Sequence, residues 1–585
     1  EYTSFYTNTF QPTFFQSNID SETNANPLND LTEVRGERYA TNVEPTLNYK
    51  KSVGEHNFDI LLGGARQDIT QNSIAIYAEG LPSNNITNVA QFASNIINTG
   101  GGRFDNKLFS TFARLNYNYA KKYLFTAIVR RDKTSLFADG FNTGTFPSFS
   151  AGWVISDEDF FNKDGLFNSL KARAGYGELG SQNVDPYSNQ SVVGSSSPFT
   201  VGGAGGQIPG FAITSLVDPT LSFETSKTIN FGVDARLLDN DLRVSLDYFN
   251  RDNEDVIQAV AIPDSNGSVT PVFQNASSIN NKGFEFEAEY NYDKGGDFTF
   301  NVGFNVSAIR NELTSSPNPI VGPSYNEEGL RANRFEVGQP LGFFFGFKTD
   351  GIYNDQAEID NDPFLANDPA RRALLVPGDF RRVDINRDGI INDEDQTSLG
   401  DPTPDFSYGI NLSANYKNWD FGAFFNGVQG NEIYNVTKFF GYFFLDDNKL
   451  GIVRDSYTPQ NTGTNLPRVS TQDAAGNQLP SDFFVEDGSF LRLKTLEVGY
   501  NLTDFVGKEW VTNVRVFANV QNLFTITNYS GYDPEVGSNN SGLGTNRGFF
   551  GFSPSTNSDS VFDRGLDVRS QPRPRTFIMG IQMSF

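Results

Sequence analysis

One stretch decides the fold, Phe298-Thr299-Phe300-Asn301-Val302-Gly303-Phe304-Asn305-Val306-Ser307. Every second side chain in it is apolar and those between are small or polar, which is the period of a β-strand with one apolar face. Residues 284–292 alternate in the same way, with glutamates between the first apolar positions. The segment 293–297 joins the two stretches and contains two glycines, so the pair predicts a β-hairpin.

The alternation recurs along the chain, for example in 242–248, 514–521 and 576–585, and helical spacing is nearly absent. It persists for about 9–13 residues, the length of a tilted strand that crosses a bilayer. Strands of soluble sandwiches usually have about five or six residues. Tyr117, Tyr119 and Tyr123 gather around the turn at Lys121-Lys122, where an interfacial girdle would lie. We therefore predict an all-β chain that forms a transmembrane antiparallel β-barrel.

The composition excludes several classes of function. The 585 residues carry 70 acidic and 45 basic side chains, a formal net charge of −25, no cysteine and a single histidine, His56. These counts exclude a disulfide scaffold, a Cys/His zinc site and a thiol enzyme. The acidic balance argues against a nucleic-acid partner. Nothing in the sequence indicates a pair of catalytic carboxylates, and we expect that the protein is not an enzyme.

The lengths of the connections orient the barrel. Outer-membrane barrels have short turns on the periplasmic side and long loops outside. Short turns are expected at 53–56, 121–122, 238–241, 293–297, 417–418 and 503–510, and long loops at 73–106, 181–221, 433–488 and 525–572. This assignment places both ends of the chain in the periplasm and gives about sixteen spanning strands. The first residues show no signal peptide and no initiator Met, so we expect the chain to be a fragment or a processed product.

The segment 311–403 breaks this scheme. If 341–353 spanned the membrane, the short turn at 417–418 would fall on the outer side. We therefore expect 311–403 to be one long extracellular excursion with local structure of its own. A further spanning strand within 354–403 would restore the order of the turns as well.

The excursion contains an EF-type calcium loop at 384–395. Oxygen-bearing side chains occupy positions 1, 3 and 5 of this loop, Gly389 is at position 6 and an acid is at position 12. The predicted ligands are Asp384, Asn386, Asp388, the carbonyl of Ile390, Asn392 and Asp395. A structural Ca²⁺ or a similar hard cation would hold the excursion in place. The alternative is an acidic, solvated turn without a metal.

An aromatic cluster opens the long loop that follows 419–432. Its members are Phe439, Phe440, Tyr442, Phe443 and Phe444. Exposed rings of this kind could bind sugar rings or apolar substrate groups, which makes them weak substrate-binding candidates. The alternative is that they continue the outer aromatic girdle.

Charged residues on the polar side of the strands are expected to face a wet lumen or a plug. Examples are Arg243, Glu285, Glu287, Glu289 and Arg515. The chain ends on Phe585, and an aromatic carboxy-terminus is the usual assembly signal of bacterial outer-membrane barrels.

Several motifs resemble one family, the SusC/RagA-like TonB-dependent transporters of Bacteroidetes outer membranes. They are Leu115-Asn116-Tyr117-Asn118-Tyr119, Arg130-Arg131-Asp132, Thr145-Phe146-Pro147-Ser148, Leu170-Lys171-Ala172-Arg173-Ala174-Gly175-Tyr176-Gly177, Pro377-Gly378-Asp379-Phe380, Gly400-Asp401-Pro402-Thr403-Pro404 and Leu491-Arg492-Leu493-Lys494. The resemblance covers nearly the whole chain in order. Thr134 is a small departure, because the family usually has Ser there.

The resemblance implies a barrel of about 22 strands with roughly six strands before residue 1. It also implies an upstream plug domain and a segment that contacts TonB, neither of which is in this chain. Family members usually pair with a SusD-like surface lipoprotein and import oligosaccharides or oligopeptides. The implied function is active import of such nutrients across the outer membrane of a Gram-negative bacterium.

Two other functions remain open on the sequence. A passive porin or structural barrel subunit would have the same strands without coupling to TonB. A secreted, soluble all-β glycan-binding protein would need polar side chains on the outward face of 298–306 and 577–585, where the sequence has apolar ones.

Overall fold

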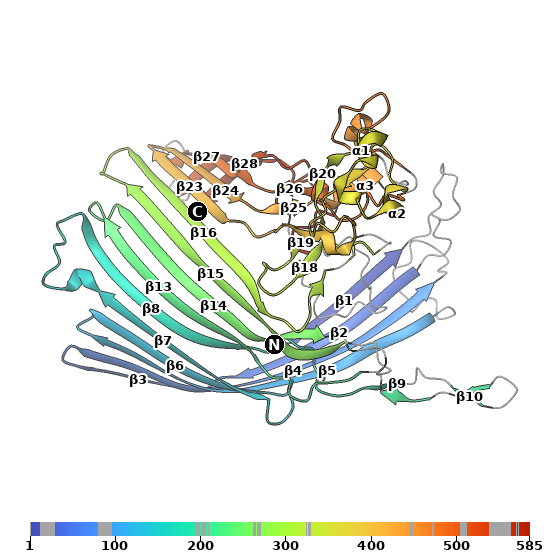
Figure 1. The fold of residues 1–585 in the computed structure, drawn as a ribbon. Helices are drawn as coiled ribbons and strands as arrows, with labels where there is room; N and C mark the ends of the chain where they lie inside the picture. Colours follow the sequence, from blue (N-terminus) through green and yellow to red (C-terminus); the bar gives the residue numbers. More distant parts are fainter. Residues whose placement is uncertain are drawn as a thin grey trace.

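The computed structural model describes residues 2–11, 30–79, 96–194, 199–201, 206–208, 210–213, 215–260, 262, 265, 271–322, 324–325, 329–443, 449–470, 473–503, 512–536, 563–568, 570 and 572–584. Most of these residues belong to one antiparallel sheet of 17 strands, which curves into a wide trough (Figure 1). Neighbouring strands of the sheet follow one another along the chain. They are β1 (Tyr2–Gln11), β2 (Asp30–Val43), β3 (Thr46–Val53), β4 (His56–Glu79), β5 (Ile96–Tyr119), β6 (Tyr123–Thr134), β7 (Thr143–Val154), β8 (Phe167–Ser181), β13 (Glu224–Leu237), β14 (Leu242–Val260), β15 (Val272–Tyr292), β16 (Phe298–Ser315), β23 (Phe406–Tyr416), β24 (Trp419–Gln429), β27 (Phe490–Asn501), β28 (Asn513–Thr527) and β29 (Thr576–Ser584).

The strand count agrees with the sequence once one interruption is recognised. Both β2 and β3 pair with β4, β2 through Val43 with Arg66 and β3 through Thr46 with Gly63. They are two pieces of a single strand position, so the sheet has sixteen positions, and the predicted count is confirmed. Among the described residues β1 and β29 do not pair with each other, so the sheet has two open edges.

Because the strands pair in register, apolar residues lie next to apolar residues from one strand to the next, and the alternation of apolar and polar side chains continues across the sheet. One row of neighbouring positions is Val233, Leu246, Phe286, Val306 and Tyr408. Large apolar side chains of this face are exposed, Phe284 by 57 % and Phe231 by 55 %. An exposed apolar surface that spans many strands needs a lipid or a protein partner. We call this side of the sheet the apolar face and the opposite side the polar face. No helix in the described ranges is long and apolar enough to cross a membrane.

Two expectations about the sheet are wrong. The loop predicted at 73–106 is largely strand, because β4 and β5 are 24 residues each and pair as far as Ala78 with Ile96. Their pairing continues beyond a bilayer's width because the backbone N–H and C=O groups of each strand form hydrogen bonds with those of the other. Gly101 permits this pairing, since a Cβ there would lie 2.3 Å from Ser73 O. Residue 2 is also not at the short-turn end. Tyr2 pairs with Tyr39, which pairs with Thr70, far along β4 from its start at His56.

Three connections between sheet strands pack together into a compact unit that we call the cap. It comprises the described residues of 316–405, 430–489 and 563–570, at one end of β16, β23, β24, β27 and β28 (Figure 1). The segment 341–353 lies in the cap and contributes to small sheets, not to the large one. The cap elements are β17 (Ile320–Val321), β18 (Asn333–Phe335), β19 (Phe343–Phe347), β20 (Thr349–Ile352), α1 (Gln356–Asp360), η6 (Pro363–Leu365), α2 (Pro369–Arg372), β21 (Phe380–Arg382), η7 (Asp393–Asp395), β22 (Gln396–Gly400), β25 (Glu432–Tyr434), α3 (Val436–Phe443), η8 (Gly451–Asp455), η9 (Asp482–Phe484) and β26 (Val485–Asp487). Outside sheet and cap lie η4 (Ile155–Asp157) and the short strands β9 (Val193–Gly194), β10 (Phe199–Val201), β11 (Gly206–Ile208) and β12 (Ala212–Ile213).

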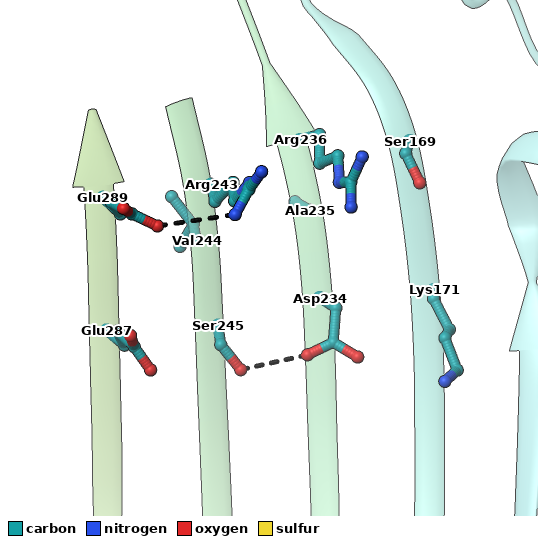
Figure 2. Close-up of a pocket in the computed structure, with 10 residues that line it drawn as sticks. All are labelled: Ser169, Lys171, Asp234, Ala235, Arg236, Arg243, Val244, Ser245, Glu287 and Glu289. Atoms are coloured by element: carbon teal, nitrogen blue, oxygen red, sulfur yellow. Dashed lines mark hydrogen bonds and ion pairs between the residues drawn. The ribbon is translucent and has the colours of Figure 1, made fainter. Parts of the chain in front are cut away.

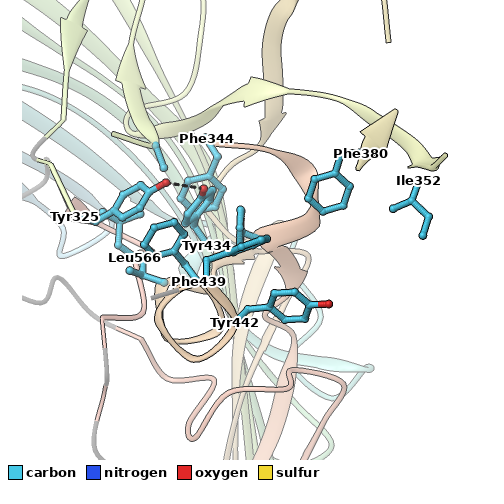
Figure 3. Packing of buried hydrophobic residues seen from close by; sticks show 12 residues of the cluster. Tyr325, Phe344, Ile352, Phe380, Tyr434, Phe439, Tyr442 and Leu566 are labelled. Carbon is cyan, nitrogen blue, oxygen red and sulfur yellow. Dashed lines mark hydrogen bonds between the residues drawn. The ribbon is translucent and has the colours of Figure 1, made fainter. Parts of the chain in front are cut away.

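The cap has a hydrophobic core of its own, drawn from all three connections (Figure 3). Tyr325 and Phe344 come from the first connection, Tyr434 and Phe439 from the second and Leu566 from the third. The hydroxyls of Tyr325 and Tyr434 are 3.2 Å apart, so one of these two buried phenols donates a hydrogen bond to the other. Burial of each large side chain contributes about 1.5–3 kcal/mol. The three connections are thus held as one body and do not behave as three separate loops.

A carboxylate organises the aromatic residues at the short-turn end of β6 and β7. Glu158 follows η4 and accepts hydrogen bonds from Tyr123 Oη at 2.6 Å and Trp153 Nε1 at 3.0 Å, and Lys122 Nζ is 3.2 Å away. These hydrogen bonds, with the Lys122 ammonium, lower the pKa of Glu158 from 4.5 to about 2. Glu158 therefore ties the predicted girdle to the turn that follows β7.

Replacement of this carboxylate should give a pH-dependent loss of stability. Because the folded pKa of Glu158 is depressed, its contribution is fully present above about pH 4.5 and is lost as the pH falls toward 2. We expect Glu158→Gln to lower the unfolding temperature of the detergent-solubilised protein at pH 7 and to match the unsubstituted protein near pH 2. Asp159→Asn, at the neighbouring exposed carboxylate, is the control and should have little effect. A loss of stability that is equal at both pH values would contradict the assignment.

Candidate functional site

The polar face of the sheet carries a dense set of charges. The five residues expected to face a lumen all lie on this face, because each alternates with a residue of the apolar face. Near the short-turn end of β8, β13, β14 and β15, charged side chains line a groove of about 410 Å³ (Figure 2). Lys171, Asp234, Arg236, Arg243 and Glu289 project into it, and Arg243 Nη1 is 3.6 Å from Glu289 Oε2. The groove therefore offers both signs of charge to whatever fills the trough.

One arginine beside this groove joins three strands. Arg173 on β8 donates from Nε to Asp234 Oδ2 on β13 at 3.0 Å and from Nη1 to Asp247 Oδ1 on β14 at 2.7 Å. To reach β14 the guanidinium passes over Gly232, where a Cβ would lie 2.6 Å from Arg173 Cζ. The long reach of Arg173 is possible only because the intervening position has no side chain.

The same arrangement occurs a second time on the polar face, nearer the β29 edge of the sheet. Arg515 on β28 donates from Nε to Asp420 Oδ1 on β24 at 2.9 Å and from Nη2 to Glu497 Oε1 on β27 at 2.6 Å. It passes over Gly499, where a Cβ would lie 2.5 Å from Arg515 Nε. Sequence reasoning found Arg515 but missed both glycines. In the sequence these glycines could be recognised because each lies on the polar face of a strand between one that carries the arginine and one that carries a carboxylate. This relation can be seen only once the register of the strands is known.

A third arginine, at the cap end of the polar face, is nearly inaccessible. Arg492 donates from Nη2 to Asp533 Oδ1 at 2.7 Å and from Nη1 to Glu535 Oε2 at 2.8 Å. Lys494 Nζ also binds Glu535, at 2.6 Å. Charge-assisted hydrogen bonds of this kind hold the segment after β28 against the wall. The six carboxylates bound by Arg173, Arg515 and Arg492 thus serve as partners of arginines.

The structure places the predicted cation ligands in one loop, with most of their oxygens engaged by backbone amides. Asp384 Oδ2 accepts from Gly389 N at 2.7 Å, and Asp395 Oδ1 and Oδ2 accept from Ile385 N and Asn392 N, both at 2.9 Å. Gly389 has a φ of +78°, as the sharp turn requires. Within the described ranges no three His, Cys, Asp or Glu side chains converge as a metal site would need. A carboxylate oxygen has a second lone pair, so an amide bond does not exclude a cation, and the cation stays a prediction.

Most of the aromatic cluster is not an exposed surface, and the expectation that its rings could bind substrate is wrong for Phe439, Tyr442 and Phe443, which are buried. Phe439, Tyr442 and Phe443 are buried on α3, and Phe440 packs against the same core (Figure 3). Nor do they continue a girdle, because they form the interior of the cap. Burial raises the pKa of Tyr442 to about 12, and its hydroxyl is 2.7 Å from Pro467 O. Phe444 and Phe585 lie outside the described residues.

Buried charges of the cap have partners that the sequence did not reveal. Asp379 is fully buried and accepts from Arg468 Nε at 2.5 Å, Asn477 Nδ2 at 2.9 Å and Val376 N at 2.9 Å. Arg382 lies 4.2 Å from the centre of the Phe347 ring, and burial lowers its pKa to about 9. These contacts bring together residues about ninety positions apart, so no local pattern could have indicated them.

The sheet, with an apolar outer face and a charged inner face, defines a β-barrel of the bacterial outer membrane. The chain matches the family described as "TonB dependent receptor-like, beta-barrel" over residues 1–523 and belongs to that family. It is 31 % identical over 559 residues to TonB-dependent receptor P3 of Formosa agariphila, covering 93 % of this chain and 52 % of that protein. It is 27 % identical over 544 residues to TonB-dependent receptor SusC of Bacteroides thetaiotaomicron, covering 92 % of this chain and 49 % of SusC.

A solved structure agrees with this assignment at the level of the fold. "Structure of the RagAB peptide transporter" matches all of this chain and 59 % of that chain with a TM-score of 0.77, at 20 % sequence identity. The SusC/RagA-like resemblance is thereby confirmed, and the family is one of transporters rather than enzymes. The alternative of a soluble glycan-binding protein is overturned by family membership. The chain spans about half the length of the curated relatives that it matches.

The glycines beneath the arginines should be intolerant of a methyl group. We expect Gly499→Ala to displace Arg515 from Asp420 and to destabilise the barrel by about 2 kcal/mol, since hydrogen bonds to charged groups are lost. The measurement is thermal unfolding of the detergent-solubilised protein. Gly422→Ala is the matched control. Gly422 lies on the polar face of the neighbouring strand β24, and no atom is within 4 Å of its Cβ position. Equal shifts in the two variants would contradict the bridging role of Arg515.

Proposed function

We propose that the whole protein, whose barrel wall this chain supplies, actively imports oligomeric nutrients across the outer membrane. In this proposal a SusD-like lipoprotein sits over the cap, and a plug upstream of this chain closes the lumen until TonB displaces it. The substrates would be oligopeptides or oligosaccharides. A solved structure of the same fold is named a peptide transporter, which supports oligopeptides, and oligosaccharides are included because the SusC/RagA-like resemblance implies them.

The observation that carries the proposal is the cap. It joins three connections through one aromatic core and is therefore a broad, preformed surface at one end of the barrel. The backbone of a preorganised surface usually moves little when a partner binds, so such a surface is suited to hold a lid protein. The charged polar face supports the same proposal, because a wall with both signs of charge can bind the polar surface of a plug and stay hydrated when the plug moves.

Uptake by cells distinguishes this function from a passive porin. The full-length gene is deleted and restored, and uptake of labelled oligopeptides and oligosaccharides is followed with and without a protonophore. Active import predicts uptake that requires the gene and is abolished by the protonophore, together with a lipoprotein that copurifies in detergent. Uptake that persists in the presence of the protonophore would support the porin alternative and overturn the proposal.

We also propose that the loop 384–395 binds a structural Ca²⁺. The supporting observations are the oxygen-bearing residues at the ligand positions, the turn at Gly389 and the attachment of the loop to the rest of the cap. Asn367 provides that attachment. Its side chain donates a hydrogen bond from Nδ2 to Asp388 O at 2.6 Å, and its backbone N–H donates one to Gly389 O at 2.9 Å. A bound cation would therefore stabilise the cap and not only the loop.

Calcium should raise the unfolding temperature of the full-length protein. At 100 times its Kd a ligand of the native state adds about 2.7 kcal/mol to the free energy of unfolding. We expect Asp388→Ala to abolish this effect and Asp393→Ala, at a loop position that is not a predicted ligand, to retain it. An unfolding temperature that is the same in calcium and in EDTA would show that the loop is a metal-free turn.

A further inference from the structure

Four cationic side chains surround one exposed phenylalanine on the apolar face of β4, β5 and β6. Register places Arg66 and Lys133 on either side of Phe109, in one row across the three strands. Lys107 is the next residue of this face along β5, and Arg131 is the next along β6. Opposite and diagonal neighbours on adjacent strands have Cβ atoms about 4.5–8 Å apart, so each cationic side chain lies within this distance of Phe109. We call Arg66, Lys107, Arg131 and Lys133 the basic cluster.

The basic cluster is exposed and only partly compensated by carboxylates. All four side chains are exposed, and Phe109 between them is 55 % exposed. Arg66 Nη2 is 3.0 Å from Asp68 Oδ2, and Asp68 also lies opposite Lys107 in register, with Asp105 next to Lys107 on the same face. In the described part of the chain no carboxylate lies within 4.0 Å of the charged nitrogens of Arg131 and Lys133, so the positive charge of the cluster is least compensated on β6.

The position of the basic cluster relates it to the membrane. Below it on the same three strands lie only apolar or small side chains, down to Tyr119 and Tyr123 at the short-turn end. From Tyr119 to Phe109 the strand rises about 34 Å, which at a tilt of about 40° is about 26 Å of height. This matches the apolar band of an outer-membrane barrel, about 25 Å. The basic cluster thus lies where the hydrocarbon ends on the long-loop side, at the level of the outer lipid headgroups.

We propose that the basic cluster binds the phosphate groups of an outer-leaflet lipid. Guanidinium and ammonium groups bind phosphate through charge-assisted hydrogen bonds, and the arginine fork can bind it at two points. Phe109, in the middle, packs against the apolar part of the same lipid. A free phosphate ion has the same charged group as a lipid headgroup, but it has no apolar part that could pack against the aromatic ring or the adjoining apolar band. This lipid site is separate from the import function proposed above.

A lysine elsewhere on the same face provides the comparison. On β13, Lys227 is on the same face as Ile229, two residues nearer the long-loop end. Its Nζ lies 2.5 Å from Glu254 Oε2 on β14. Its charge is thus neutralised within the protein, whereas the charges of Arg131 and Lys133 are not. The contrast makes Lys227 a matched control at a similar depth.

The test measures binding of diphosphoryl lipid A to the full-length protein in neutral detergent by native mass spectrometry. We expect the double variant Arg131→Gln/Lys133→Gln to bind at least tenfold more weakly than the unsubstituted protein. Lys227→Gln should bind within twofold of it. Lipid A from which the phosphates have been removed should bind as weakly as the double variant does. Inorganic phosphate at millimolar concentration should not compete.

Two results would overturn the proposal. Undiminished lipid binding by the double variant would remove the basic cluster from the site, and full competition by inorganic phosphate would make it a site for a free anion. Heat-modifiable gel migration reports whether each variant is folded. If the first double variant does not fold, Arg66→Gln/Lys107→Gln tests the same cluster with the same expected tenfold loss.

Discussion

The structure depends on one constraint, that a backbone inside a bilayer must find every hydrogen-bond partner in a neighbouring strand. This constraint forces strands to pair in register over the full depth of the membrane, and register in turn sends alternate side chains to opposite faces. A slip of one residue between β15 and β16 would exchange Phe304 and Val306 for Asn305 and Ser307 on the lipid side. The apolar band, the charged lumen and the basic cluster all follow from that single alignment.

Register also explains why the lumen is built from arginines that cross glycines. A guanidinium can neutralise carboxylates on two other strands only if the strand between has no side chain at the crossing point, as at Gly232 and Gly499. Each crossing ties three strands together on the polar face, and the Arg515 guanidinium also lies 5.1 Å from the centre of the Phe517 ring. Removing one partner of such a bridge leaves a charge without its hydrogen bonds, which costs more than the bridge itself contributes. The glycine is therefore as necessary to the bridge as the arginine.

The sequence predicted what depends on neighbouring residues and missed what depends on distant ones. Period-two alternation and the hairpin turns are local, so the all-β class and sixteen strand positions could be predicted from them. The length of β4 and β5 could not, because their outer pairing involves Gly101 and Ser73 across a long connection. The aromatic cluster at 439–443 was mistaken for a surface because aromatic density is the same in a girdle and in a core. Only contacts with Tyr325, Phe344 and Leu566, each far away in the chain, distinguish the two.

The distribution of charge bears on what a substrate would meet in the lumen. The formal net charge of −25 suggests an acidic channel that favours cations. Yet Asp234 and Asp247 share Arg173, Asp420 and Glu497 share Arg515, and Asp533 and Glu535 share Arg492. Each arginine neutralises one of its two carboxylates, so the groups at Arg173 and Arg515 carry one net negative charge instead of two, and Lys494 offsets the remaining charge of the Arg492 group. Selectivity for a substrate would therefore be set by local features such as the mixed-charge groove between β8 and β15, and the net charge of the chain is a poor guide to it.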